Sequence, residues 1–165
     1  MTAFLSRFRI VRRADAGATD PILVIAAIAV SLVLLVGGSF AVAGMISNGK
    51  NLNAQGDLDK VATAETAATS GGGGNYLNWT WDGTNAPTGD TDTDGNKLDK
   101  QVVGFTPTAG EYIVVSASPA GWVAGVKSTS GQAYYRSSLS STVYKGLSAA
   151  VAAPMPGSLV PPVLP

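Results

Sequence analysis

The chain has 165 residues, of which 45% are hydrophobic and 13% charged, and its formal net charge is zero. It contains neither cysteine nor histidine, which excludes disulfides, thiolate metal sites and catalysis by a Ser-His or Cys-His pair. We therefore expect no enzymatic activity, and no basic patch large enough to hold nucleic acid is visible.

The first predicted element is an apolar helix over residues 21–46. These 26 residues carry no charge, and about 20 apolar residues suffice for a helix to cross a bilayer core. Asp20 favours a helix start as an N-cap, and Pro21 needs no amide partner at the first helical position. Basic residues before the segment place its N-terminal side in the cytoplasm and the rest of the chain outside. They are Arg7, Arg9, Arg12 and Arg13.

Three fates are open for this segment. It could remain as a single-span anchor. It could be a secretory signal peptide with a small-x-small site at residues 41–43, cleaved before Gly44. Alternatively, the chain could be cut after Gly17 on the cytoplasmic side, which leaves the apolar segment at the new N-terminus.

The helix is expected to continue to about Thr69. In this outer half a narrow apolar stripe recurs at helical spacing, interrupted by one acid. The stripe consists of Leu58, Val61, Ala62, Glu65 and Ala68. Asp57, Asp59 and Lys60 fall outside it, and the glycine run 71–74 must end the helix.

A basic leader ending in glycine, RRADAG, thus precedes an apolar helix that continues into the polar sequence NLNAQGDLDKVATAETAAT. This order resembles type IV pilins and the pseudopilins of type II secretion systems. The resemblance implies a leader at residues 1–17, a long helix at 18–70 and a prepilin peptidase that cuts between Gly17 and Ala18. It also implies methylation of the new N-terminus.

The resemblance has departures near the cleavage point. Ala18 stands where the family usually has a bulky apolar residue, and Ile22 stands where it usually has Glu. In the family that Glu pairs with the terminal amine of a neighbouring subunit during assembly. Asp20 is the nearest acid here, and it either takes over this pairing or serves only as the helix cap.

A small extracytoplasmic, β-rich head is expected over residues 71–153. Leu77, Trp79 and Trp81 alternate on one face of a strand, and the two tryptophans are expected in the core rather than in a sugar-binding platform. Further strands are predicted at 101–106, 111–117, 121–128 and 132–138. With hairpin-sized connections they form an antiparallel meander of three or four strands that the outer half of the helix covers. The fold class is therefore α+β and pilin-like.

The end of the chain is less regular. Residues 141–153 fit either a last strand or a short helix. Residues 154–165 are rich in proline, and we expect an extended or disordered tail there.

One loop is a candidate calcium site. Carboxylates at alternate positions followed by Gly95 can wrap a hard cation, and the spacing begins like an EF-hand loop. It departs from that loop at the twelfth position, which is Gln101, so that Asp99 or Asp82 would have to complete the shell. A solvated polar turn is the alternative. The candidate ligands are Asp90, Asp92, Asp94, Asn96 and Asp99.

These patterns favour a pilin-like structural subunit in a bacterial cytoplasmic membrane, assembled with other pilin-like subunits into a surface filament or secretion pseudopilus. The alternative is an anchored or signal-peptide-cleaved domain that binds calcium, sugar or a protein. An enzyme is a distant third hypothesis, because it would need a carboxylate pair such as Asp82 and Glu111 to meet in a cleft.

Overall fold

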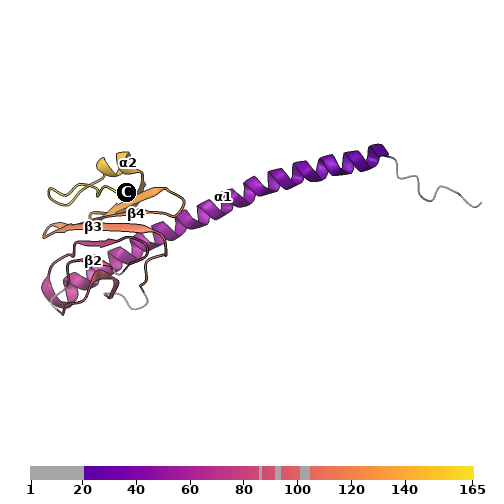
Figure 1. Cartoon of the computed structure of the whole chain (residues 1–165). Helices are drawn as coiled ribbons and strands as arrows, with labels where there is room; N and C mark the ends of the chain where they lie inside the picture. Colours follow the sequence, from indigo (N-terminus) through magenta and orange to yellow (C-terminus); the bar gives the residue numbers. More distant parts are fainter. Residues whose placement is uncertain (1–20, 86, 92–93, 101–104) are drawn as a thin grey trace, which may run out of the picture. The chain divides into compact units, whose positions relative to one another are not determined.

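The computed structural model of the protein describes residues 21–85, 87–91, 94–100 and 105–165. Its first element is the helix α1, Pro21–Ala68, which confirms the long N-terminal helix expected from the sequence (Figure 1). The chain divides into two compact units at Val42, within this helix. The first unit contributes the start of α1, and the C-terminal unit, residues 43–165, contains all the strands.

The C-terminal unit is built on a six-stranded antiparallel sheet with the order β2-β1-β3-β4-β5-β6. A long helix and an antiparallel sheet confirm the α+β class. The strands are β1 Trp79–Trp81, β2 Thr88–Gly89, β3 Tyr112–Ser118, β4 Gly121–Lys127, β5 Ala133–Ser137 and β6 Ser140–Lys145. The short helices are a π-helical turn Thr69–Gly73, a 3-10 turn Leu98–Lys100 and α2 Leu147–Val151.

The meander expected from the sequence is present in β3 to β6. Residues 141–153, left open between strand and helix, contain most of β6 followed by α2. A strand was expected at 101–106. Of these residues the structure describes only Phe105 and Thr106, and both lie outside any strand, so the prediction is wrong for them. The neighbour of β3 is instead β1, which pairs Trp79 with Val115.

One face of the sheet packs against the outer half of α1. Alternate residues of β3 and β4 point to this face, and Trp79 is 1% exposed with its ring centroid 6.4 Å from that of Phe105. Trp81 is also buried, so the two tryptophans belong to the core, as expected, and offer no sugar-binding platform. The buried core includes Ala54, Leu58, Val61, Ala64, Ala68, Leu77, Ile113, Val115, Trp122, Ala124 and Val126.

The stripe predicted on the outer half of α1 is therefore the packed face. Glu65 is fully buried within it. Asp57, which was expected outside the stripe, is also fully buried, so that part of the prediction is wrong. The helix ends in the glycine run as predicted, where Gly74 adopts a left-handed conformation with φ of 65°.

The other face of the sheet is covered by the C-terminal segment 154–165, hereafter the proline strap. A methyl group added at Gly121 would lie 2.8 Å from Pro156, and one at Gly125 would lie 3.1 Å from Pro162. The Ser137 hydroxyl donates a hydrogen bond of 2.7 Å to the Pro154 carbonyl. In Figure 1 this yellow segment lies across the sheet from the magenta end of α1. The expected disordered tail is thus corrected to an irregular segment that packs on the sheet.

Candidate functional site

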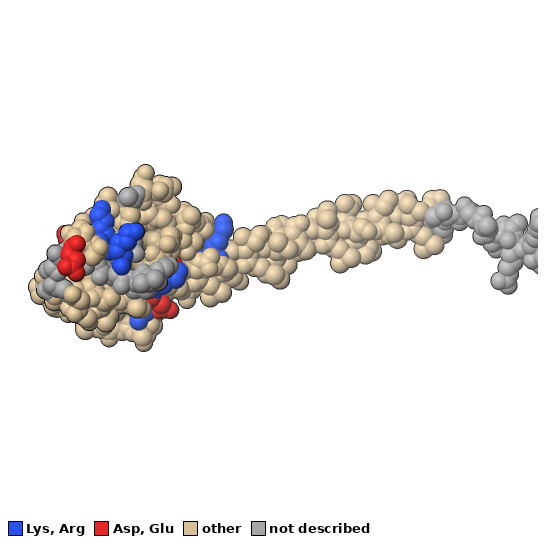
Figure 2. Space-filling model, turned by 90° about the horizontal axis from the view of Figure 1, so that it is seen from below, with Lys and Arg blue, Asp and Glu red and all other residues tan. Residues whose placement is uncertain are grey.

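The most distinctive surface of the molecule is the apolar segment of α1, Pro21–Ile46. It is long and apolar enough to cross a membrane, and none of its most apolar stretch is buried. Figure 2 shows the same segment without a charged side chain on the visible face. The exposed large side chains are Ile22, Leu23, Val24, Ile25, Ile28, Val30, Leu32, Val33, Leu34, Leu35, Val36, Phe40, Val42, Met45 and Ile46. A helix that is apolar all round requires an apolar surrounding rather than water.

The two hydroxyls of this segment are satisfied within the helix. Ser31 donates to the Ala27 carbonyl and Ser39 to the Leu35 carbonyl, each at 2.8 Å. Neither hydroxyl therefore needs a water or a polar partner. The segment presents an essentially hydrocarbon surface despite these residues.

The predicted processing and assembly residues Gly17, Ala18 and Asp20 lie outside the described residues. Cleavage after Gly17 and the pairing of Asp20 with a neighbouring subunit stay predictions. The same holds for calcium ligation by Asp92, which also lies outside them.

The rest of the predicted calcium loop is described in part. Asp90 accepts two hydrogen bonds from Asn78 on one carboxylate oxygen, and Asp94 and Asn96 are exposed but engaged in interactions. Asp99 lies in the 3-10 turn. Among the described residues, no three acidic side chains come together in a way that could hold a metal ion. Calcium binding by this loop stays a prediction.

Asp82, the proposed extra ligand, organises a turn. Its Oδ1 accepts from the backbone N–H groups of Asn85 at 2.7 Å and Thr84 at 3.0 Å. These bonds to Asn85 and Thr84 lower the pKa of Asp82 to about 2. The turn uses this carboxylate as an acceptor, which explains an acid at this position without a metal.

Among the described residues, three carboxyl groups are fully buried where α1 meets the β-rich region, and the sequence had placed only Glu65 on the packed stripe. Asp57 Oδ2 accepts from the Thr108 N–H at 2.7 Å, and Glu65 Oε2 accepts from the Leu77 N–H at 3.0 Å. Two carboxylates of α1 thus bind backbone donors of the β-rich region. Such bonds attach the helix to that region at defined positions.

The third buried carboxyl, Glu111, lies beside Asp57. Burial, together with the negative charge of Asp57, raises the pKa of Glu111 to about 8. Burial raises the pKa of Glu65 to about 7, although the Leu77 bond opposes the shift. The carboxylate whose charge acts on Glu111 is thus Asp57, not the Asp82 of the enzyme hypothesis. Perturbed carboxyls occur in enzyme sites and in structural clusters alike. Here Asp57 and Glu65 connect α1 to backbone donors outside the strands.

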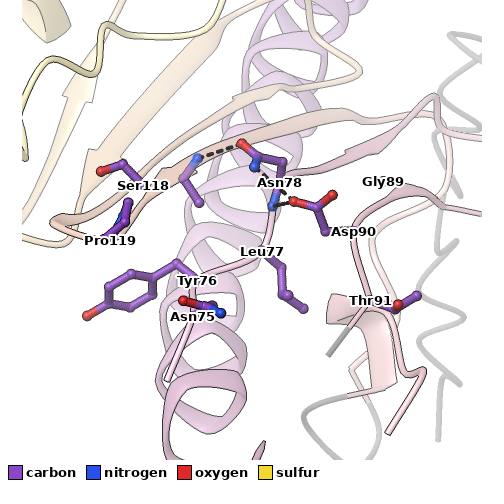
Figure 3. A pocket seen from close by; sticks show the side chains of 10 residues that line it. Asn75, Tyr76, Leu77, Asn78, Gly89, Asp90, Thr91, Ser118 and Pro119 are labelled. Atoms are coloured by element: carbon purple, nitrogen blue, oxygen red, sulfur yellow. Dashed lines mark hydrogen bonds between the residues drawn. The ribbon is translucent and has the colours of Figure 1, made fainter. Parts of the chain in front are cut away.

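A polar groove of about 630 Å³ lies where the segment after α1 meets the ends of β2 and β3 (Figure 3). Sequence reasoning missed this groove, because its walls come from three segments that are distant along the chain. Its lining residues are Asn75, Tyr76, Leu77, Asn78, Gly89, Asp90, Thr91, Ala117, Ser118 and Pro119.

Comparisons of the chain with protein-family models, with curated proteins and with solved structures find no match. The class that the fold defines is therefore a coarse one. Within the part of the chain that the structure describes, one apolar helix near the N-terminus is a candidate membrane span, and a C-terminal α+β unit follows it.

Proposed function

We propose that this protein is a pilin-like structural subunit, inserted in a bacterial cytoplasmic membrane by residues 21–46 and assembled with other such subunits after leader cleavage. The observation that carries the proposal is the uncharged segment of α1, whose apolar side chains are exposed on every side. This surface fits lipid before assembly and the corresponding helices of other subunits afterwards.

The sequence around this segment supports the proposal. Four arginines precede the span, whereas Lys50 and Lys60 are the first basic residues after it, and this excess of basic residues on the N-terminal side fits a cytoplasmic N-terminus. The leader ends at Gly17, the position at which a prepilin peptidase would cut. The outer half of α1 carries the sheet, so one continuous helix links the proposed assembly surface to the rest of the chain.

The first test is the N-terminus of the mature protein, measured by intact mass after purification from native membranes. We expect the chain to start at Ala18, with a methylated amine. A start at Gly44 would instead support a secreted binding domain, and an intact Met1 would support a simple anchor. Either of these two results would contradict the proposal.

Two variants separate the possible processing enzymes. Gly17→Ala should block leader removal and leave membrane insertion unchanged. Ala43→Leu keeps the segment apolar but removes the small residue that a signal peptidase needs, so it should leave processing unchanged. The opposite pattern would contradict cleavage by a prepilin peptidase.

Assembly itself can be tested by cross-linking. The chain contains no cysteine, so one introduced at Val33 is chemically unique. We expect oxidised membranes to contain cross-linked chains in the Val33→Cys variant. A cysteine at the exposed residue Asn53, outside the apolar segment, is the matched control. Equal cross-linking at both positions, or none at Val33, would speak against lateral packing of the apolar helices.

A further inference from the structure

The polar groove of Figure 3 is held in shape by the side chain of Asn78. The Asn78 N–H and the Asn78 Nδ2 donate to Asp90 Oδ2 at 3.1 and 2.9 Å. Asn78 Oδ1 accepts from the Ala117 N–H at 2.8 Å. One amide therefore binds both flanking walls, the end of β3 and the residue after β2 (Figure 3).

The backbone reinforces the same contact. The Asp90 N–H donates to the Asn78 carbonyl at 2.7 Å. Gly89 has φ of 134°, and a Cβ there would lie 2.2 Å from the Asn78 carbonyl oxygen. Only glycine therefore lets these two backbone segments approach this closely. The groove is thus formed before any ligand arrives, which reduces the entropic cost of binding.

The walls of the groove carry two kinds of chemistry. Asp90, Asn75, Thr91 and Ser118 provide carboxylate, amide and hydroxyl groups, and the second oxygen of Asp90 points away from Asn78 in Figure 3. Tyr76 lines the groove, is half-buried and packs against the core. Such a ring offers an apolar face beside polar groups.

We propose that this groove binds a neutral carbohydrate. A sugar presents adjacent hydroxyls that both donate and accept hydrogen bonds, and a C–H face that stacks on an aromatic ring. No lysine or arginine is among the lining residues, which disfavours phosphate, sulfate and other anions. The groove is too polar for a lipid chain, and its volume lies within the range of small-molecule sites.

This site is separate from the membrane segment and does not depend on how the subunits assemble. It is also separate from the tryptophan pair, which is buried. A subunit that binds sugar at this groove would contact glycans or polysaccharide at a cell surface.

The test uses the full chain in an alkylphosphocholine detergent, because glycosidic detergents would compete for the groove. Lactose, maltose and chitobiose are added separately, and binding is measured by saturation-transfer NMR. We expect at least one disaccharide to bind. Tyr76→Ala and Asn75→Ala should each weaken its binding, with at least a tenfold loss for Tyr76→Ala. Asn75 is exposed and takes no part in the bonds that shape the groove, so its variant should fold normally.

The controls are a second tyrosine and a polar residue that lie outside the groove. Tyr144→Ala on β6 and Asp59→Asn on α1 should leave disaccharide binding unchanged, because neither residue lines the groove. Failure of all three disaccharides to bind would overturn the proposal. So would binding that Tyr76→Ala and Asn75→Ala leave intact, or a groove whose only detectable ligand is calcium added alone.

Discussion

The two halves of α1 differ in what surrounds them, although they form one continuous helix. Between Pro21 and Ile46 the helix carries no charge and exposes apolar side chains in every direction. Between Asn51 and Ala68 it buries one stripe against the sheet and exposes residues such as Asp59 and Thr63. Helix formation alone therefore does not indicate what surrounds a helix. The width of its apolar surface does indicate this.

The difference also separates two sources of stability. The outer half obtains its burial from its own chain, so its contribution is already present in a single molecule. The apolar half leaves its side chains exposed within the chain, and in the proposed function lipid or other subunits supply their apolar contacts. Substitutions in the two halves should therefore act on different measurements.

The largest effect is expected from charges in the apolar half. Each arginine near the centre of a membrane span costs about 2.5–3.5 kcal/mol in insertion, so Val33→Arg combined with Leu34→Arg should abolish stable integration. Alkaline extraction of membranes measures this. Asn53→Arg, at an exposed position of the outer half, should stay integrated like the wild type. Retention of the double variant in the membrane would contradict a spanning segment.

A smaller effect is expected from core truncation in the outer half. Leu58 is fully buried, so Leu58→Ala should lower the free energy of unfolding by about 2–5 kcal/mol. Leu52, on the same helix, is 66% exposed, and Leu52→Ala should change it by less than about 0.5 kcal/mol. Urea unfolding followed by tryptophan fluorescence reports both values, because all three tryptophans are buried in the C-terminal unit. Equal losses would refute the packing assigned to this half.

The pH dependence should also differ between the halves. Burial raises the pKa of Glu65 to about 7 and that of Glu111 to about 8, from ordinary values of 4.5. Their neutral forms favour folding, so this stability is fully present below about pH 4.5 and is lost as the pH rises toward 8. We expect the Tm of the C-terminal unit to fall by several degrees over this range. Insertion of the uncharged segment should not change.

Two conservative variants identify the groups responsible. Glu111→Gln and Glu65→Gln replace a titrating carboxyl with a neutral amide, so each should reduce the slope of Tm against pH. Their combination should nearly remove the slope between pH 5 and 8. An unchanged slope in the combined variant would mean that other groups titrate.

The smallest effect is expected at the surface of the outer half. Asp59 forms an ion pair with Arg136 and is itself mostly exposed. Arg136 is 17% exposed, but Asp59 is 68% exposed and solvent screens its charge, so Asp59→Ala should lower the free energy of unfolding by about 1 kcal/mol. The same measurement in high salt should reduce the difference further. A loss as large as that of Leu58→Ala would show that the pair contributes to the core.

Local patterns in the sequence predicted the elements that depend on local properties. The uncharged apolar run at 21–46 and the apolar stripe after it predicted the long helix. The alternation at Leu77, Trp79 and Trp81 placed the tryptophans in the core, and hairpin-sized connections predicted the order of β3, β4 and β5. Each of these follows from residues close together along the chain.

Features that depend on distant contacts were missed. The pairing of β1 with β3 joins residues more than thirty positions apart, and no local pattern announces it. Asp57 is buried where it accepts a hydrogen bond from the Thr108 N–H, 51 residues away. An acid that was expected on the exposed side of α1 therefore attaches the helix to the β-rich region. The run from Gly121 to Val126 did carry a usable signal, since a continuous apolar run is typical of a strand covered on both faces. It could have predicted a layer over the second face, which the proline strap provides.

The two edges of the sheet bear on how such a protein avoids aggregation. Edge strands expose unpaired backbone groups that can recruit another chain, and proteins confined to a membrane meet one another at high local concentration. One edge here, β2, is only two residues long, and the other, β6, pairs irregularly with β5 and ends in Lys145. Neither edge offers a long flat template. In the proposed function, lateral contacts between chains are made by the apolar helices, and these two edges would not compete with them by strand pairing.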